Sequence, residues 1–327
     1  LRGVRGCRGC ESHGIEPERK GAVADRGGMR SCVGRHIGGI LAQIRVRGSG
    51  AERLGDKIRI LLGDRPVEID DVEPTTTVLE WLRGFCGRTG TKEGCAEGDC
   101  GACTVVLGEP DGRGAIAYRT VNSCIQFVPA LDGMQLLTVE DLKRGETLHP
   151  VQQALVDAHA SQCGFCTPGF AMTLFHLYST WHGPQPPSRE ALDRALAGNL
   201  CRCTGYRPIL DAAVRMFEAP RPDRDDAKNA TALAALTRTR GLAYRDAFFA
   251  PRNLAELAGV LKAHPDARIL SGGTDLGLEV TKAHRTIPKL VHLGHVAELR
   301  AIARTGTHLE IGAAATWPRC TSFGIVR

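Results

Sequence analysis

The sequence predicts a multi-domain α+β protein. Its 327 residues are enough for two or three domains of ordinary size. Strand-like segments dominate the first part of the chain, helical periodicity follows, and a second mixed segment comes last. We therefore expect a leader at 1–55, a mixed domain at 56–145, a helical domain at 146–218, a linker at 219–245 and a partial third domain at 246–327.

The charge distribution argues against a nucleic-acid-binding surface. The net charge is +6, and residues 1–55 account for all of it with 11 Lys and Arg against 5 Asp and Glu. The remainder is neutral and offers no basic face. No window approaches the roughly 18 consecutive apolar residues of a membrane-spanning helix. We expect a cytoplasmic protein that binds neither nucleic acid nor membrane.

Residues 1–55 are rich in Gly and Arg and follow no helical or strand period, which predicts a disordered leader or a mis-assigned start. The run 36–44 has two glycines and lacks a small-residue cleavage site, which argues against a secretory signal. Cys7, Cys10 and Cys32 have no second ligand pair of matching spacing, so they are not expected to bind metal.

The first domain is expected to begin with a hairpin, because KIRILL and VEI flank the turn residues GDRP. The apolar positions of VLEWLRGF, residues 78–85, fit one face of a helix. A cysteine- and glycine-rich loop then leads into two further strands, TVVL and AIAYRT. This pattern predicts a small α+β unit with a cysteine loop at its rim.

The second domain is expected to hold four helices, over HPVQQALVDAHA, PGFAMTLFHLYSTW, SREALDRALAG and PILDAAVRMFEA. Pro150, Pro168 and Pro208 stand where a first helical turn tolerates proline, and Ser188 is a suitable N-cap. Residues 219–245 are charged and rich in Ala and Thr, which suits a linker.

The third domain is expected to contain the helix NLAELAGVLKAH, the strand ARIL, the turn SGGTDLG and the strands KLVHL and LEIGAA. These are too few elements to close a sheet and bury its faces, so we expect a truncated α+β domain.

Four cysteines in and after GCAEGDCGAC follow the plant-type spacing of a 2Fe–2S cluster: Cys95, Cys100, Cys103 and Cys124. Four thiolates around two irons require a loop that wraps the cluster. Gly98 and Gly101 permit the necessary turns and let backbone N–H groups approach sulfur.

A second set of four cysteines occurs in QCGFCTPG and NLCRCTGYRP: Cys163, Cys166, Cys201 and Cys203. These lie at the ends of expected helices, where helix N-termini favour negative charge. A disulfide, a buried thiol or a tetrahedral zinc site are the alternatives for either set. Two complete sets favour iron–sulfur clusters over zinc, while Cys86 and Cys320 match neither set.

The segments GTKEGCAEGDCGACTV, SQCGFCTPGF and GNLCRCTGYRPI resemble the signatures of the molybdenum hydroxylases, the family of xanthine dehydrogenase and aldehyde oxidoreductase. The resemblance covers residues 57–218 closely and 246–318 more loosely. It implies a plant-ferredoxin-like β-grasp domain whose 2Fe–2S cluster lies on the flavin side, and a four-helix domain whose 2Fe–2S cluster faces molybdenum. It also implies that Gln162 hydrogen-bonds the pterin of a molybdenum cofactor, although Gln162 could equally serve only to complete its loop.

The third domain resembles the FAD-binding domain of this family. The implied flavin pyrophosphate loop comprises Ile269, Leu270, Ser271, Gly272, Gly273, Thr274, Asp275 and Leu276. Its glycines would let backbone N–H groups reach phosphate oxygens. The second glycine-rich flavin loop of the family is missing, which puts FAD retention and any NAD site in question.

The order of domains resembles the small subunit of two-subunit bacterial xanthine dehydrogenases. The resemblance implies a molybdopterin-binding large subunit as partner, NAD as electron acceptor and a heterotetramer. No catalytic acid, base or nucleophile is expected on this chain. The alternatives are the same role in an aldehyde or N-heterocycle oxidoreductase, an iron–sulfur redox sensor that binds nucleic acid, and a truncated non-functional product.

Overall fold

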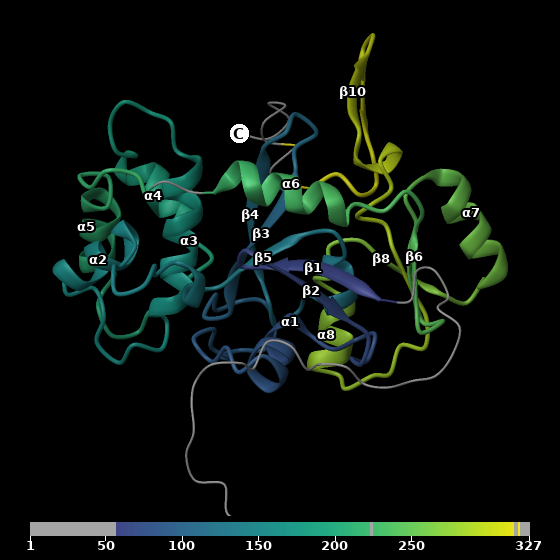
Figure 1. Ribbon diagram of the computed structural model, residues 1–327, viewed down its shortest axis with the longest axis horizontal. Coiled ribbons are helices and arrows are strands. Elements are labelled where there is room, and N and C mark those ends of the chain that lie inside the picture. Colours follow the sequence, from purple (N-terminus) through teal and green to yellow (C-terminus); the bar gives the residue numbers. More distant parts are fainter. Residues whose placement is uncertain (1–56, 223–224, 317–319, 321–327) are drawn as a thin grey trace, which may run out of the picture. The chain divides into compact units, whose positions relative to one another are not determined.

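The computed structural model describes residues 57–222, 225–316 and 320. The expected leader, with Cys7, Cys10 and Cys32, lies outside the described residues. Within them the expected fold class is confirmed: a β-grasp domain, a four-helix domain and a mixed α+β domain follow one another along the chain (Figure 1).

The first domain is built on a five-stranded sheet in the order β2-β1-β5-β3-β4. Its strands are β1 Ile58–Leu62, β2 Arg65–Ile69, β3 Thr104–Pro110, β4 Ile116–Asn122 and β5 Gln135–Leu137. The outer pairs are antiparallel, and β1 pairs with β5 in parallel. The alternating residues Ile58 and Ile60 are fully buried, as the period-two pattern of a strand requires.

The segment expected as one helix over 78–85 is a single α-turn, α1 Val78–Glu80, followed by a π-helical turn over Trp81–Phe85. Thr77 caps the segment, since its hydroxyl accepts from the Glu80 N–H and Glu80 accepts from the Thr77 N–H. Short 3-10 turns at Val128–Leu131 and Val139–Asp141 complete the domain.

The second domain contains the four expected helices: α2 Pro150–Asp157, α3 Thr167–Thr180, α4 Arg189–Leu196 and α5 Arg207–Arg215 (Figure 1). Pro occupies the first turn of α2, α3 and α5, where its missing N–H has no intrahelical partner in any case. The Ser188 hydroxyl caps α4 by accepting from the Ala191 N–H. The helices share a core, which includes Phe170, Leu174 and Ala213, with Val106 and Leu137 of the first domain's sheet.

The segment 219–245, expected as a linker, holds helix α6 Asp226–Leu236 and all of strand β6 Leu242–Tyr244. Its Ala- and Thr-rich composition weakened any helical period, and only Leu233 of α6 is buried. Just after α6, Arg238 forms an ion pair with Asp132 of the first domain at 2.6 Å. The segment is therefore attached to the first domain along part of its length.

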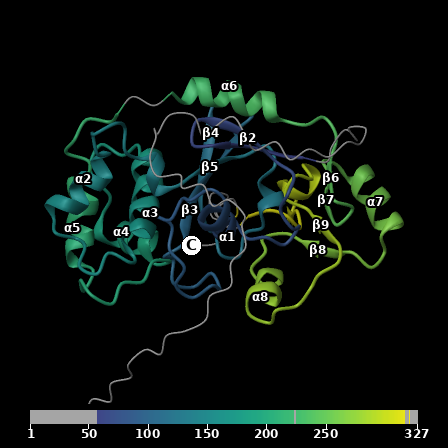
Figure 2. The same ribbon diagram turned by 60° about the horizontal axis from the view of Figure 1, so that its bottom comes forward.

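The third domain contains a four-stranded sheet in the order β6-β7-β9-β8, with β6 antiparallel and the rest parallel. Its elements are β6 Leu242–Tyr244, β7 Phe248–Ala250, α7 Leu254–Ala263, β8 Arg268–Leu270, α8 Leu276–Thr281, β9 Leu290–His292, a 3-10 turn Glu298–Arg300, β10 Ile302–Thr305 and β11 His308–Ile311. Helices α7 and α8 accompany this sheet in Figure 2. In the described part of the chain, no helix is long and apolar enough to cross a membrane.

One hydrophobic core serves both the first and the third domain. It joins residues such as Ile58 and Leu136 to Tyr244, Phe248 and Leu290. The fully buried Tyr244 also donates its hydroxyl to the Val72 carbonyl at 2.7 Å. The two domains thus exclude water jointly along this contact.

Candidate functional site

The first cysteine set comes from two places: the loop between the π-helical turn and β3 carries three of its members, and Cys124 follows β4. Backbone N–H groups point at its sulfurs: those of Asp99 and Cys100 lie 3.3 Å from Cys95 Sγ, and that of Gly98 lies 3.3 Å from Cys124 Sγ. Gly98 has φ +79°, a conformation that glycine adopts without strain. The loop therefore supplies N–H donors to sulfur before any metal is considered.

Burial differs within this set. Cys103 and Cys124 are each 2% exposed, whereas Cys95 and Cys100 are partly exposed. The hydrogen bond from the Cys124 thiol lowers the pKa of Cys103 to about 7 and raises that of Cys124. Burial opposes ionisation of Cys95, but the N–H groups of Cys100 and its neighbours outweigh it and lower the Cys95 pKa. The loop thus favours the thiolate form of Cys95 over that of its neighbour Cys100, and the thiolate form of Cys103 over that of Cys124.

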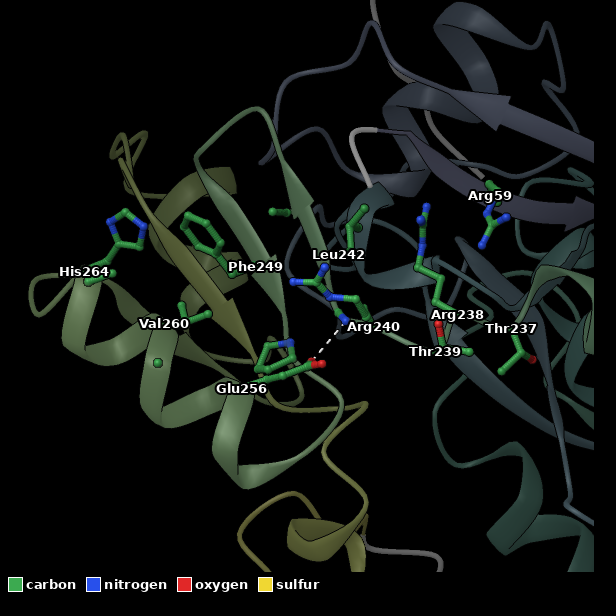
Figure 3. A pocket seen from close by; sticks show the side chains of 15 residues that line it. Arg59, Thr237, Arg238, Thr239, Arg240, Leu242, Phe249, Glu256, Val260 and His264 are labelled. Carbon is green, nitrogen blue, oxygen red and sulfur yellow. Dashed lines mark hydrogen bonds between the residues drawn. The ribbon is translucent and has the colours of Figure 1, made fainter. Parts of the chain in front are cut away.

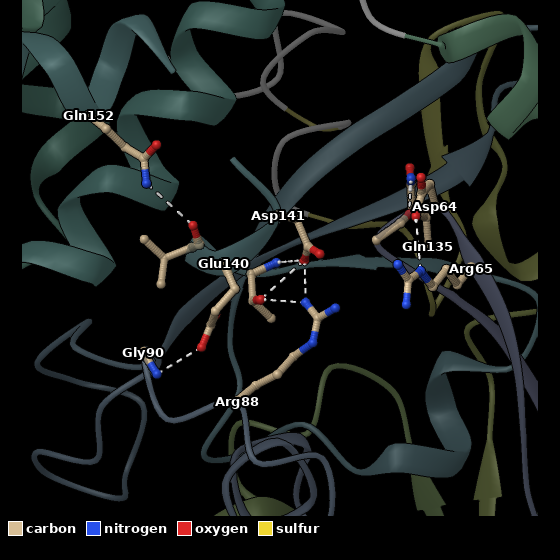
Figure 4. Close-up of polar contacts among 11 residues, drawn as sticks. Asp64, Arg65, Arg88, Gly90, Gln135, Glu140, Asp141 and Gln152 are labelled. Carbon is tan, nitrogen blue, oxygen red and sulfur yellow. Dashed lines mark hydrogen bonds and ion pairs between the residues drawn. The ribbon is translucent and has the colours of Figure 1, made fainter. Parts of the chain in front are cut away.

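The base of this loop is tied to the segment that leads into the second domain (Figure 4). The Arg88 guanidinium donates to Asp141 Oδ2 at 2.6 Å and to Thr138 Oγ1 at 2.8 Å. The Gly90 N–H donates to Glu140 Oε1 at 2.8 Å. Both ends of the 88–90 segment are therefore anchored a few residues before Cys95.

The second cysteine set lies at the start of α3 and in the loop before α5. Its thiols meet in pairs: Cys203 Sγ lies 3.4 Å from Cys163 Sγ, and the Cys166 thiol hydrogen-bonds that of Cys201. Cys163 and Cys203 are exposed, in contrast to Cys103 and Cys124 of the first set. Burial raises the pKa of Cys166 to about 12.

Thr204 and Tyr206 hold the loop around Cys201. The Thr204 hydroxyl lies 3.2 Å from Cys201 Sγ, and the Cys201 N–H donates to the Tyr206 hydroxyl at 2.9 Å. Tyr206 has φ +68°, a left-handed conformation that is uncommon for an aromatic residue. Its ring packs edge-on against Phe170 of α3, which compensates for the strain.

The arrangement of both sets suits a 2Fe–2S cluster. The ten cysteines that the structure describes are all free, so neither set is a disulfide. Each set instead divides into two thiol pairs, Cys95 with Cys100 and Cys103 with Cys124 in the first. Two thiolates per iron is the ligation that a 2Fe–2S cluster requires.

The two cysteine sets are connected through the backbone. The Leu200 N–H donates to the Cys100 carbonyl oxygen at 3.0 Å. Leu200 directly precedes Cys201, and Cys100 belongs to the first set. The backbones of Cys100 and Cys201, candidate ligands from different sets, are thus connected through one hydrogen bond and one peptide unit.

The expected flavin loop lies between β8 and α8. Ser271, Gly272, Thr274 and Asp275 are exposed, so the loop is open to a ligand. Gly273 has φ +82° and would bring a Cβ to 3.2 Å from the Ile125 carbonyl. Ile125 follows Cys124, so this loop lies beside the first cysteine set.

Helix α8 reinforces that contact. A Cβ on Gly277 would lie 2.9 Å from both the Cβ and the carbonyl oxygen of Ile125. At the end of α8, Lys282 Nζ forms an ion pair with Glu97 Oε2 at 3.0 Å. Leu278 packs on the small apolar cluster that contains Cys103, Cys124 and Ile125.

Gln162, the expected pterin contact, is exposed beside the exposed Cys163. Sequence reasoning did not single out Ile125, Asn199, Tyr206 or Thr204 around the cysteine sets. Tyr206 and Thr204 lie within the motif that was recognised, but the role of Ile125 and Asn199 depends on segments far away in the sequence.

A separate cavity of about 630 Å³ lies between β6 and α7. Figure 3 shows the side chains of Arg59, Arg238 and Arg240 along it, with Glu256 accepting from the Gly241 N–H. Neither the eight cysteines nor residues 269–276 line this cavity. It is therefore not part of the sites described above.

Three family models match the chain in succession. A 2Fe–2S iron–sulfur cluster binding domain matches residues 60–128, a [2Fe-2S] binding domain matches 138–214, and an FAD binding domain in molybdopterin dehydrogenase matches 242–326. The fold and these matches define an electron-transfer region with two 2Fe–2S-binding domains and an FAD-binding domain.

Curated relatives match most of this chain. The xanthine dehydrogenase of Emericella nidulans is 36% identical over 313 residues, covering 80% of this chain and 23% of that protein. The xanthine dehydrogenase of Drosophila pseudoobscura pseudoobscura is 32% identical over 311 residues, covering 81% of this chain and 23% of that protein. Among solved structures, quinoline 2-oxidoreductase from Pseudomonas putida 86 has a chain that is 34% identical, with a TM-score of 0.42, covering 55% of this chain and 96% of that one.

The chain contains the 2Fe–2S and FAD-binding region of the xanthine dehydrogenase/molybdenum hydroxylase family. It spans about a quarter of the length of the two curated relatives.

Proposed function

We propose that this chain is the electron-transfer subunit of a xanthine dehydrogenase. In this proposal a partner subunit oxidises xanthine to urate at a molybdenum site, and this chain conducts the electrons through two 2Fe–2S clusters to FAD and then to NAD. A 2Fe–2S cluster accepts and releases one electron at a time, and the protein sets its position and potential.

The observation that carries the proposal is the series of contacts along the chain's own residues. The Leu200–Cys100 hydrogen bond connects the second cysteine set to the first. The Gly277–Ile125 contact connects the first set to the expected flavin loop. Three cofactor sites in series with close contacts at both steps are suited to electron transfer and need no substrate pocket on this chain.

The division of roles follows from exposure. Cys163 and Cys203 are exposed beside Gln162, so the second set faces outward, where a partner's cofactor could approach. Cys103 and Cys124 are buried under α8 and Ile125. We assign the second set to the molybdopterin-binding partner and the first set to the flavin. Free cysteines suit a reducing compartment, so we assign the protein to the cytoplasm.

The choice of xanthine rests on the curated relatives and on the domain order, because no residue of this chain is proposed to touch substrate. The partner's pocket would distinguish xanthine from an aldehyde or an N-heterocycle. A heterotetramer of two small and two large subunits is the assembly that we expect.

The direct test is to purify the chain anaerobically and measure iron, acid-labile sulfide and flavin, with EPR of the dithionite-reduced sample. We expect about four irons per chain, two distinct rhombic 2Fe–2S signals and FAD near one per chain. Cys124→Ala should remove one signal, whereas Cys86→Ala should retain both because Cys86 belongs to neither set. Zinc in place of iron would refute the proposal, and clusters without flavin would refute its flavin step.

A further inference from the structure

Asn199 is a polar residue buried between the two cysteine sets, two positions before Cys201. It is 3% exposed, although asparagine is rarely buried to this extent. Its amide Nδ2 donates to the Gly101 carbonyl at 3.0 Å and lies 3.2 Å from Thr104 Oγ1, and its Oδ1 accepts from Thr173 Oγ1 at 2.7 Å. One side chain thereby joins α3, the first cysteine loop and the start of β3.

The orientation of the amide follows from its neighbours. The Gly101 carbonyl can only accept, so the amide nitrogen must face it. The Thr104 hydroxyl already donates to the same carbonyl at 2.7 Å, which leaves it free to accept from Nδ2. The amide therefore fits its site in one orientation, with no buried polar atom left without a partner.

Asn199 acts where the two backbones touch. A Cβ at Gly101 would lie 2.1 Å from the Gly198 carbonyl, and a Cβ at Gly169 would lie 2.2 Å from the Gly101 carbonyl. The next residue, Leu200, makes the hydrogen bond to Cys100. Movement of Asn199 would thus change the spacing between Cys100 and Cys201 directly.

We propose that Asn199 is a positioning residue that fixes the distance between the two clusters, an inference that rests on the proposed function. It binds no iron and touches no sulfur. It holds the first cysteine loop against the second, so that the Leu200–Cys100 hydrogen bond forms and electron exchange between the clusters is fast. Three hydrogen bonds to a nearly fully buried amide supply the rigidity.

The test uses the full chain, with both clusters reduced for the EPR measurement and both oxidised before the electron-exchange measurement. The spin–spin interaction between two reduced clusters falls with the cube of their separation, so its splitting in EPR spectra reports on spacing. We expect Asn199→Ala to retain its iron and the g-values of both signals, to lose the splitting, and to show slower electron exchange between the clusters after a light-driven pulse of reductant. The Leu200 amide should also exchange its hydrogen faster.

Two matched comparisons sharpen the result. Thr173→Val keeps the side-chain shape but removes the hydroxyl that holds Oδ1, so it should weaken the splitting, whereas Thr173→Ser should preserve it. Gly198→Ala changes the residue beside Asn199 where a Cβ meets nothing within 4 Å, so it should behave as the wild type. If Asn199→Ala fails to fold, Thr173→Val decides the outcome.

The inference is overturned if the splitting is unchanged in Asn199→Ala and Thr173→Val, or if both variants lose iron, which would assign the residue to folding of the cysteine loop alone. A wild-type chain without two 2Fe–2S signals would instead refute the proposed function. The two failures are therefore distinguishable in the same set of spectra.

Discussion

Gly277 of α8 lies against Ile125, the residue that follows Cys124, so closely that a Cβ would come within 2.9 Å of the Ile125 backbone. This contact places the third domain against the residue that follows Cys124 of the first cysteine set. We expect Gly277→Ala to destabilise the protein by about 1–3 kcal/mol because it overpacks a site with backbone on one side. It should also slow reduction of flavin by the clusters.

The matched control for Gly277→Ala is Gly259→Ala in α7. Gly259 is exposed, and a Cβ there meets nothing within 4 Å. Alanine should stabilise this helix interior by about 1 kcal/mol. Urea unfolding measures both changes, and equal effects of the two variants would contradict the importance of the Ile125 contact.

The Arg88–Asp141 ion pair is expected to stabilise the base of the first cysteine loop. Its side chains are 22% and 13% exposed and the pair measures 2.6 Å, so solvent screens it less than a surface pair. Arg88→Ala should cost about 1.5–3 kcal/mol of unfolding free energy, the range for hydrogen bonds to charged groups. Arg65→Ala, which breaks an exposed pair with Asp64, should cost less than about 0.5 kcal/mol in the same denaturation assay.

Arg238 neutralises Asp132, whose side chain is 2% exposed. Arg238→Ala would leave a buried carboxylate without its partner, and we expect a loss of about 3–5 kcal/mol. Adding Asp132→Asn should recover part of that loss, because an amide oxygen can still accept from the Arg59 N–H that now donates to Asp132 at 2.9 Å. A double variant no more stable than Arg238→Ala would show that the buried charge is not the cause.

Stability should fall as the pH is lowered through the weakly acidic range. Burial lowers the pKa of His292 to about 4, against an ordinary value of 6.5, and also lowers the pKa of the neighbouring His295. The unfolded state then binds more protons than the folded state between these pH values, so stability rises with pH across this window and is lost as pH falls through it. One unit of difference corresponds to about 1.4 kcal/mol.

His292→Phe should reduce this pH dependence, because it removes one of the titrating groups, while the neighbouring His295 remains, and places a second aromatic ring near Phe248. Exposed His182 provides the control, and His182→Gln should leave the profile unchanged. Urea midpoints at pH 7 and pH 5 measure the effect. An unaltered slope in His292→Phe would rule out this histidine as its source.

Thr204 should raise the reduction potential of the second cluster. A thiolate can only accept, so the Thr204 hydroxyl must donate to Cys201 Sγ, and such donation stabilises the reduced, more negative cluster. We expect Thr204→Val to lower the potential and Thr204→Ser to preserve it, in a redox titration followed by EPR. A shift of the other cluster's potential alone would contradict this assignment.

The sequence predicted best those features whose signal is periodic or confined to a short segment, namely the helices of the second domain and the cysteine sets. The helical period identified α2 to α5, and cysteine spacing identified both sets, because these signals are contained within a few turns of chain. The strand β5 was missed because three residues are too few to show an alternation. Helix α8 was missed because its six residues follow a glycine-rich turn.

The contacts between domains could not be predicted in the same way. Asn199 finds its partners Gly101 and Thr104 nearly a hundred residues away, and nothing local distinguishes it from an exposed asparagine. Gly277 likewise matters only because Ile125 lies beside it. Such long-range contacts depend on how the helices, strands and loops pack in three dimensions, and a single sequence carries no local signal for this packing.

The core shared by Ile58, Leu136, Tyr244 and Leu290 limits how this chain can be recombined. An FAD-binding domain taken from another protein would lack the apolar residues that pack against the first domain in this core. The four-helix segment also shares a core with Val106 and Leu137 of the first domain's sheet, so a replacement segment would need matching apolar residues there as well as an asparagine equivalent to Asn199.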